Sequence, residues 1–446
     1  MSVLQRLQQR FASSRFDWVL FWAMIALLTI GIFFIYSSGI DSNGQQTHQG
    51  AAPEYIKQIV WVITGFTLFL IAALFDYNQL HLLSIWFFLV SLVLLIAVLL
   101  VGKYVAGARS WLGISFLGIQ PAELAKVTTI IALASFFDAQ GPGAGKSFKN
   151  LIIGGIIVGI PMLLIMLQPD FGSASAFTSI FFFIALFAEA SAALLFFVIL
   201  TGGLLTVYIL LPLWDEHIAT KNIWLTNLLT DPQLSGQLSI AFGILIVLAG
   251  FGWLRYKKTA YFTLAYIGLA NLLAIYGSII VRNILKPYQV QRLLTFLNPA
   301  IDPLGSGWQI TQSITAIGSG GLTGKGFLQG TQSHLQYLPE QSTDFVFSII
   351  LEETGFIGGC IVIILYFIIM WRIMRILYNT RDPFCRYLCA GAFGMFAFHT
   401  LINIGMVLGL MPITGIPLLL VSYGGSSIWA SMMMLGIVMS GTMRHY

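Results

Sequence analysis

Long apolar runs separated by short polar segments dominate this chain of 446 residues. A helix needs about 20 mostly apolar residues to cross the hydrocarbon core of a bilayer. Runs near that length predict about twelve transmembrane helices, at residues 19–36, 58–75, 82–102, 121–137, 151–167, 172–188, 191–213, 238–254, 260–282, 345–371, 387–410 and 416–439. Only Glu189 and Ala190 separate two of these runs, so a tight turn is needed there. The pattern predicts an all-α polytopic membrane protein, folded as a single transmembrane domain over residues 1–446.

One segment departs from this pattern. Residues 283–346 form the longest connection and carry charged side chains among many glycines. A loop longer than about 15 residues in a compact protein is usually functional or disordered. This loop keeps aromatic and β-branched residues such as Trp308, Ile310 and Tyr337, which argue against disorder. We therefore interpret it as the active surface of a membrane enzyme.

Composition supports the membrane assignment. The chain is 58% hydrophobic and 9% charged, whereas a soluble domain has about 25% charged residues. The net charge of +5 does not point to nucleic acid, because the cations lie in the loops between the apolar runs. Cys360, Cys385 and Cys389 all fall in or beside apolar runs, which excludes a disulfide framework and a cysteine metal cluster.

The distribution of Lys and Arg predicts the orientation. With the N-terminus in the cytoplasm, thirteen of the 22 Lys and Arg residues fall in inner segments, and both termini lie inside. The first run is longer than a signal-peptide core and lacks a small-residue cleavage site, so we expect it to be retained. The outer cations gather in residues 103–120 and 282–346, where a topology signal would not place them.

Polar residues from separate helices fall on the outer side of this topology. They include Arg109, Gln120-Pro-Ala-Glu123 with Lys126, Gln168-Pro-Asp170, and Ser422 to Ser427 in the outer half of the last run. Ionisable residues inside a membrane are costly and therefore candidates for function. The alternative for Glu123 and Lys126 is structural, since Glu123 suits a helix N-terminus and pairs with Lys126 at i, i+3.

Asp344, near the end of the longest connection, is the candidate general base of the membrane enzyme. The alternative is that Asp344 only caps the helix that begins at Phe345. Glu352 and Glu353 lie about two turns into the same helix, where both a buried structural network and catalysis remain open. His399 stands alone on an apolar helix, so we expect a core histidine. The glycine-rich residues 318–326 lack P-loop spacing and are better interpreted as backbone that approaches another group closely.

Several motifs in order carry a family resemblance. They are Gly107-Ala-Arg-Ser-Trp111, Gln120-Pro-Ala-Glu-Leu-Ala-Lys126, Gln168-Pro-Asp170, Arg292 with the run Asn298 to Gln309, Leu338-Pro-Glu-Gln-Ser-Thr-Asp-Phe345 and Val421-Ser-Tyr-Gly-Gly-Ser426. Together they resemble the SEDS family (shape, elongation, division and sporulation) over about residues 18 to 440. Members typically have ten spans, so the resemblance implies one extra helix pair, which we expect within residues 191–282.

The resemblance implies a function. SEDS proteins are peptidoglycan glycosyltransferases that polymerise lipid II on the outer face of the bacterial inner membrane, together with a class B penicillin-binding protein. The residues before Leu338 resemble the rod-shape (elongation) branch more than the division branch, so elongasome components are expected partners. The family's essential aspartate corresponds to Asp344 and its acidic residue of the fourth helix to Glu123. Ser342 and Ser110 stand where many members carry histidine and arginine, respectively.

The implied chemistry assigns roles to the other polar residues. Asp344 would act as base for the attacking sugar hydroxyl. Cations would stabilise the departing pyrophosphate, and the substrate-binding or supporting residues that we expect are Glu123, Lys126, Arg109, Arg292, Lys325, Gln309, Gln312 and Glu340. The family makes a divalent cation, Mg²⁺ or Mn²⁺, an expectation, although no ligand motif identifies it. The alternatives are a lipid II flippase, a division-specific relative and a scaffold without activity.

Overall fold

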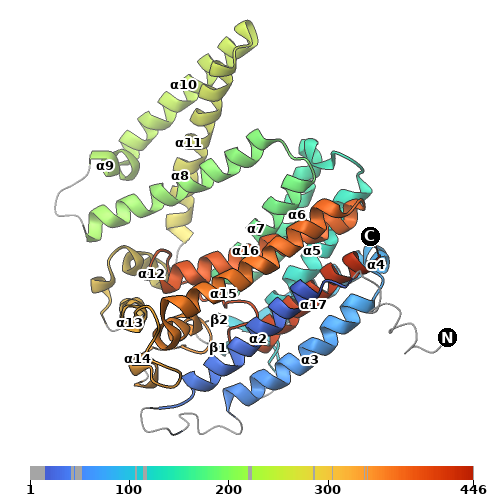
Figure 1. The fold of residues 1–446 in the computed structure, drawn as a ribbon. Coiled ribbons are helices and arrows are strands. Elements are labelled where there is room, and N and C mark those ends of the chain that lie inside the picture. Colours follow the sequence, from blue (N-terminus) through green and yellow to red (C-terminus); the bar gives the residue numbers. More distant parts are fainter. Residues whose placement is uncertain are drawn as a thin grey trace. The chain divides into compact units, whose positions relative to one another are not determined.

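The structure is a computed structural model that describes residues 16–41, 45, 53–105, 108–113, 118–218, 224–284, 287–303, 305–335, 337–338 and 340–444. Its helices (Figure 1) are α2 (Trp18–Ser38), α3 (Glu54–Leu74), α4 (Tyr77–Val101), α5 (Pro121–Ala139), η1 (Ala144–Lys146), α6 (Phe148–Met166), α7 (Phe171–Phe187), α8 (Ala192–His217), α9 (Trp224–Thr230), α10 (Pro232–Tyr256), α11 (Thr259–Ile284), α12 (Pro287–Leu297), η2 (Pro299–Ile301), α13 (Ser306–Gly320), α14 (Thr331–His334), α15 (Val346–Asn379), α16 (Pro383–Val407) and α17 (Gly425–Arg444). A short antiparallel pair, β1 (Lys103–Val105) and β2 (Ala108–Trp111), interrupts the helices.

Each of the twelve predicted apolar runs contributes to a helix. Ten of the described helices are long and apolar enough to cross a membrane, while α7 is apolar but shorter. The remaining run became α5, which is 19 residues long and carries Glu123, Lys126 and Asp138. The predicted tight turn between α7 and α8 is confirmed, because Glu189 adopts a left-handed conformation (φ 65°) and Ser191 caps α8.

The chain forms two compact units, one comprising residues up to Ala190 together with those from Gln309 onward, and the other comprising Ser191–Trp308. In the first unit α16 and α17 are the most buried of the helices that could span a membrane. Small residues allow the close packing of α16: a Cβ at Gly394 would lie 2.9 Å from the carbonyl oxygen of Ser179 on α7. In the second unit, α10 and α11 pack as an antiparallel pair next to α8 (Figure 1).

The structure adds detail to one sequence expectation and corrects another. The connection 283–346 contains the helices α12, η2, α13 and α14. Helix α13 forms because Ile310, Ser313 and Ala316 recur at helical spacing and are buried. The last apolar run also starts too early: α17 begins at Gly425, and residues 412–424 form an irregular segment, so Ser422 to Gly424 precede the helix.

Helix α15 is interrupted at Gly355, whose backbone has φ 68°. The carbonyl oxygens of Glu352 and Glu353 accept the backbone N–H groups of Lys325 (3.1 Å) and Gly326 (2.9 Å) instead of groups one turn along the helix. In return, the N–H groups of Phe356 and Ile357 donate to the carbonyls of residues 321 and 322 at 2.9 and 3.2 Å. The glycine-rich segment therefore approaches another group closely, as expected, and that group is the backbone of α15.

Candidate active site

A tight turn places Asp344 at the start of α15. The carbonyl oxygen of Glu340, itself in a left-handed conformation (φ 52°), accepts the backbone N–H groups of Thr343, Asp344 and Phe345 at 3.1 to 3.4 Å. Helix α15 begins at Val346, and Phe345 occupies its N-cap position. The structure thus assigns the N-cap position to Phe345 rather than to Asp344. Asp344 is half-buried one residue before the cap.

Asn403 of α16 fixes the backbone of this turn. Its side-chain amide donates to the carbonyl oxygen of Asp344 at 2.9 Å and to that of Ile416 at 2.8 Å. The Asp344 carboxylate lies against Gly415, where a Cβ would be 3.5 Å from Oδ2. One fully buried side chain thus holds the Asp344 turn and the irregular segment 412–424 together.

One helical turn earlier, His399 joins the same segment to the Glu123–Lys126 pair. His399 Nδ1 donates to the carbonyl oxygen of Pro417 at 3.0 Å, which leaves Nε2 to accept from Lys126 Nζ at 2.9 Å. Lys126 Nζ also lies 2.7 Å from Glu123 Oε1. The Lys126 side chain is 0% exposed and that of Glu123 is 2% exposed. The predicted i, i+3 pair is thus present, and α16 connects it to the turn that carries Asp344.

Apart from Arg109, the motifs that the sequence placed on the outer side converge in the first unit. Gln120 donates its backbone N–H to Ser426 Oγ (2.8 Å) and its side-chain amide to Asp170 Oδ2 (2.9 Å). The backbone N–H of Tyr423 donates to the carbonyl of Ser342 at 2.9 Å. The starts of α5, α7, α15 and α17 therefore meet around the segment 412–424.

Other predicted site residues have different surroundings. Arg109 Nε donates to the carbonyl of Gly102 at 2.9 Å and Nη1 to that of Leu99 at 3.1 Å, so it covers the C-terminal end of α4. Arg292 is exposed on α12 of the second unit. Gln309 and Gln312 lie one turn apart on α13, and Oε1 of Gln312 is buried without a hydrogen-bond partner among the described residues.

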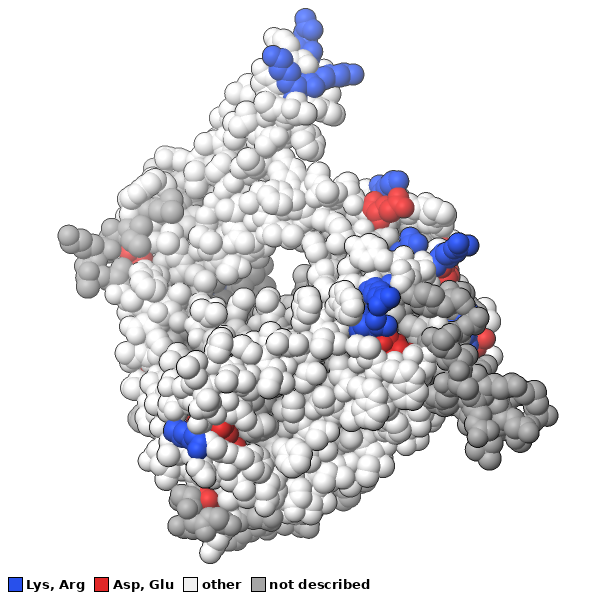
Figure 2. Space-filling model, in the orientation of Figure 1, with Lys and Arg blue, Asp and Glu red and all other residues white. Residues whose placement is uncertain are grey.

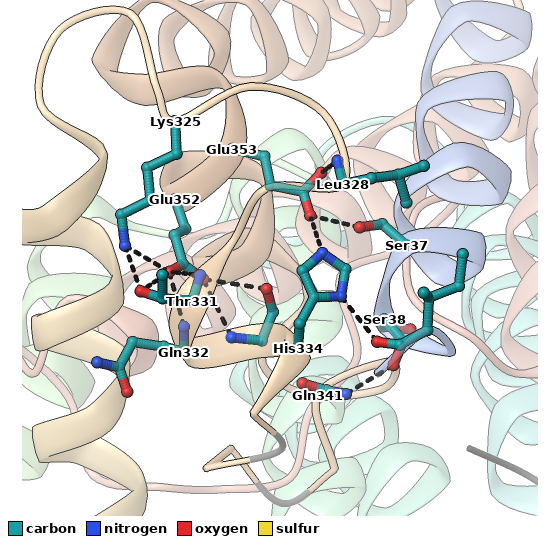
Figure 3. A network of polar contacts seen from close by, with 12 residues as sticks. Ser37, Ser38, Lys325, Leu328, Thr331, Gln332, His334, Gln341, Glu352 and Glu353 are labelled. Atoms are coloured by element: carbon teal, nitrogen blue, oxygen red, sulfur yellow. Dashed lines mark hydrogen bonds and ion pairs between the residues drawn. The ribbon is translucent and has the colours of Figure 1, made fainter. Parts of the chain in front are cut away.

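Lys325 and Glu352 belong to a dense polar network (Figure 3). The Glu352 carboxylate is fully buried and accepts Lys325 Nζ (2.9 Å) and the backbone N–H groups of Thr331, Gln332 and Ser333 at 2.7 to 3.1 Å. These N–H groups form the N-terminus of α14, where a negative charge is favoured. Of the two roles left open for Glu352, the contacts support the structural one. Lys325 Nζ also donates to Thr331 Oγ1 at 2.6 Å.

Glu353 extends this network to α2. Its carboxylate accepts hydrogen bonds from Ser37 Oγ and from the backbone N–H of Leu328 (3.2 Å). Its Oε1 also lies 3.5 Å from His334 Nε2, which is within ion-pair distance. His334 Nδ1 donates to the carbonyl of Ile40 at 2.7 Å. The contact with Glu353 is the largest cause that raises the pKa of His334 above its ordinary value, against the opposing effect of burial. A cavity of about 530 Å³ beside this network is lined by Tyr36 of α2, by Ile40 and Asp41 after that helix, and by residues of the segment 328–335.

Within the described part of the chain, no group of three or more His, Cys, Asp or Glu side chains is arranged to hold a metal ion. Mg²⁺ commonly binds through only one or two carboxylates together with substrate phosphates, so its binding does not require such a group. The divalent cation stays a prediction, and no step below depends on it.

Sequence reasoning missed Asn403 and assigned His399 to the core. Both side chains are buried, as the sequence suggested for His399. A usable signal was present, because the two polar residues lie four positions apart on an otherwise apolar helix and therefore share one face.

Comparison with known proteins identifies the family. The family model for FtsW, RodA and SpoVE, described as "Cell cycle protein", matches residues 18–236 and 214–445. The chain belongs to this family. Together the two matches cover nearly all of the described residues, so the resemblance found in the motifs is confirmed.

Relatives match along most of their length. Peptidoglycan glycosyltransferase RodA of Treponema pallidum is 41% identical over 96% of this chain and 97% of its own. Stage V sporulation protein E of Bacillus subtilis is 30% identical over 95% and 96% of the two chains. Peptidoglycan glycosyltransferase MrdB of Escherichia coli is 32% identical over 80% and 76%.

Solved structures share the fold. A chain from a peptidoglycan synthase complex aligns with a TM-score of 0.66 at 24% identity, covering 97% of this chain and 98% of its own. The rod-shape-determining protein RodA of Thermus thermophilus aligns with a TM-score of 0.59 at 21% identity, over the same shares of the two chains. The predicted SEDS-like helical bundle is thus confirmed, and the protein is a multi-pass membrane protein.

Proposed function

We propose that this chain is a peptidoglycan glycosyltransferase of the elongation branch, which polymerises lipid II with Asp344 as catalytic base. The observation that carries the site assignment is the double hydrogen bond from Asn403 to the carbonyls of Asp344 and Ile416. These two hydrogen bonds hold the turn of Asp344 at the place where four of the family motifs meet. The relatives named peptidoglycan glycosyltransferase supply the reaction class.

The reaction follows from what Asp344 can do. Its carboxylate takes the proton of a sugar 4-hydroxyl as that oxygen attacks the anomeric carbon of the second lipid II. The glycosidic bond forms, the bond to the lipid pyrophosphate breaks, and the pyrophosphate leaves with its negative charge. A positioned base contributes about 10²–10⁴-fold to the rate.

Supporting roles follow from burial. Lys126 and Glu123 are enclosed in the bundle, so in this conformation they stabilise the site through His399 rather than by touching substrate. Cations stabilise the leaving pyrophosphate, and Arg292, exposed on α12, stays a predicted candidate from the sequence. Arg109 and Lys325, each engaged with protein groups here, Gln309 and Gln312 on α13, and Glu340 in the Asp344 turn are proposed to support substrate binding.

The cellular location, the orientation and the partners are part of the same proposal. The protein lies in the bacterial inner membrane with both termini in the cytoplasm and Asp344 on the periplasmic side. The N-terminal cations that support this orientation precede the described residues. The partners are a class B penicillin-binding protein and other elongasome components, which agrees with the similarity to a chain of a peptidoglycan synthase complex.

The deciding experiment is a gel assay for polymer from labelled lipid II, with the purified protein and its penicillin-binding partner. We expect polymer from wild type and none from Asp344→Asn. Glu216→Gln is the matched control, because Glu216 is an exposed carboxylate on α8. Lipid flipping without polymer would favour a transporter, and neither activity would favour a scaffold. Restoration of division rather than of rod shape in depleted cells would favour the division branch.

A further inference from the structure

The α10–α11 hairpin of the second unit ends in an exposed cationic tip. Arg255, Lys257 and Lys258 are all exposed where α10 ends and α11 begins. Figure 2 shows their blue atoms grouped together with no red atoms beside them. The sequence explains this, since it contains no Asp or Glu between Pro232 and Ile301.

The tip is a defined structure rather than a frayed end. Lys257 turns the chain with a left-handed conformation (φ 50°), and its N–H donates to the carbonyl of Trp253 at 2.8 Å. The rings of Tyr256 and Tyr261 stack across the turn with centroids 5.9 Å apart. Gly252 makes room for this packing, because a Cβ there would lie 2.7 Å from the Tyr261 ring.

Below the tip, the hairpin presents a surface suited to lipid. Large apolar side chains on one side of α10 are 55 to 70% exposed, at Ile240, Ile244, Val247, Leu248, Phe251 and Leu254. Their spacing of three and four residues makes a continuous stripe along the helix. Trp253 and Tyr256 lie at its end, 44% and 61% exposed. Such aromatic residues lie at the level of the lipid headgroups, so the three cations lie there too.

We propose that the tip binds the phosphate headgroups of anionic phospholipids, and that the α10–α11 hairpin is thereby a lipid-anchoring element. Three positive charges without acidic neighbours complement a negatively charged membrane surface. This role is independent of Asp344 and gives a function to the region where the extra helix pair was expected.

The test is site-resolved crosslinking with the full-length protein. Wild type is reconstituted in vesicles of phosphatidylcholine and phosphatidylglycerol. In one sample phosphatidylglycerol carries a photoactivatable headgroup, and in a parallel sample phosphatidylcholine carries it. The labelled peptides are mapped by mass spectrometry. We expect phosphatidylglycerol to label residues 253–262 in clear preference to phosphatidylcholine. The Lys257→Gln/Lys258→Gln variant should lower that preference about tenfold, and high salt should weaken it in wild type.

Two further variants separate charge from folding. Lys257→Arg/Lys258→Arg keeps the charge and should keep the preference. Lys149→Gln/Arg381→Gln removes two other exposed cations, both in the first unit, and should leave labelling of the tip unchanged. Equal labelling by the two lipids, labelling by neither, or an unchanged preference in the Lys257→Gln/Lys258→Gln variant would overturn the proposal.

Discussion

Asn403 donates a hydrogen bond of 2.9 Å to the carbonyl oxygen of Asp344, and the same amide group reaches Ile416 at 2.8 Å. The carboxylate proposed as the base is thus positioned through the backbone of its own residue. Asn403→Ala would leave two carbonyls without their donor, and leaving a buried group unsatisfied costs about 1–3 kcal/mol. We expect kcat for polymerisation to fall at least tenfold, with a smaller change in KM. Asn150→Ala, which removes a single amide-to-carbonyl bond near η1, is the control and should retain kcat. Unchanged kcat in Asn403→Ala would contradict the positioning role.

The buried pair of Glu123 and Lys126 gives a second prediction. Lys126→Met leaves the Glu123 carboxylate buried without its cation, and such a loss costs about 3–5 kcal/mol. The double variant Glu123→Gln/Lys126→Met removes both charges and should recover part of that stability. Thermal unfolding of the four proteins of the double-mutant cycle in detergent measures the coupling. Additive losses would show that the two charges do not stabilise each other.

The interruption of α15 makes Gly355 sensitive to substitution. A Cβ there would lie 2.3 Å from the backbone nitrogen of Gly324, and the residue has φ 68°. We expect Gly355→Ala to lower the melting temperature, since a strained left-handed residue alone costs about 1–3 kcal/mol. Gly155→Ala on α6 meets nothing within 4 Å and should be neutral or slightly stabilising by comparison. Equal melting temperatures would argue against the close approach of the two backbones.

The surroundings of His334 lead us to expect that the folding stability depends on pH. Its pKa is raised above the ordinary value, first because of Glu353. A raised pKa in the folded state means that protonated His334 contributes stability that is fully present below the unfolded pKa, about 6.5, and is lost as pH rises through the folded pKa. The stability difference between wild type and His334→Gln should therefore shrink from acidic to alkaline pH. Glu353→Gln should reduce this pH dependence. A stability difference between wild type and His334→Gln that grows with pH would contradict the prediction.

The sequence predicted the helices well because membrane spans leave a strong apolar signal in the chain. It also placed the motifs of Gln120, Asp170 and Ser426 on one side of the bundle, because the spans alternate in direction, but only the structure shows that these residues meet. It did not predict the role of Asn403, since a polar residue on a buried helix reveals neither its partner nor its direction. The break in α15 was also missed, because the apolar run continues through Gly355 and its replacement partners lie some 30 residues earlier.

The break at Gly355 divides α15 into two mechanical parts. The first, Val346 to Thr354, is mostly buried and is anchored by Glu352 to α14, and both parts are hydrogen-bonded to the glycine-rich residues 321–326. The turn that carries Asp344 therefore continues into a short helical segment, which the backbone of residues 321–326 separates from the rest of α15.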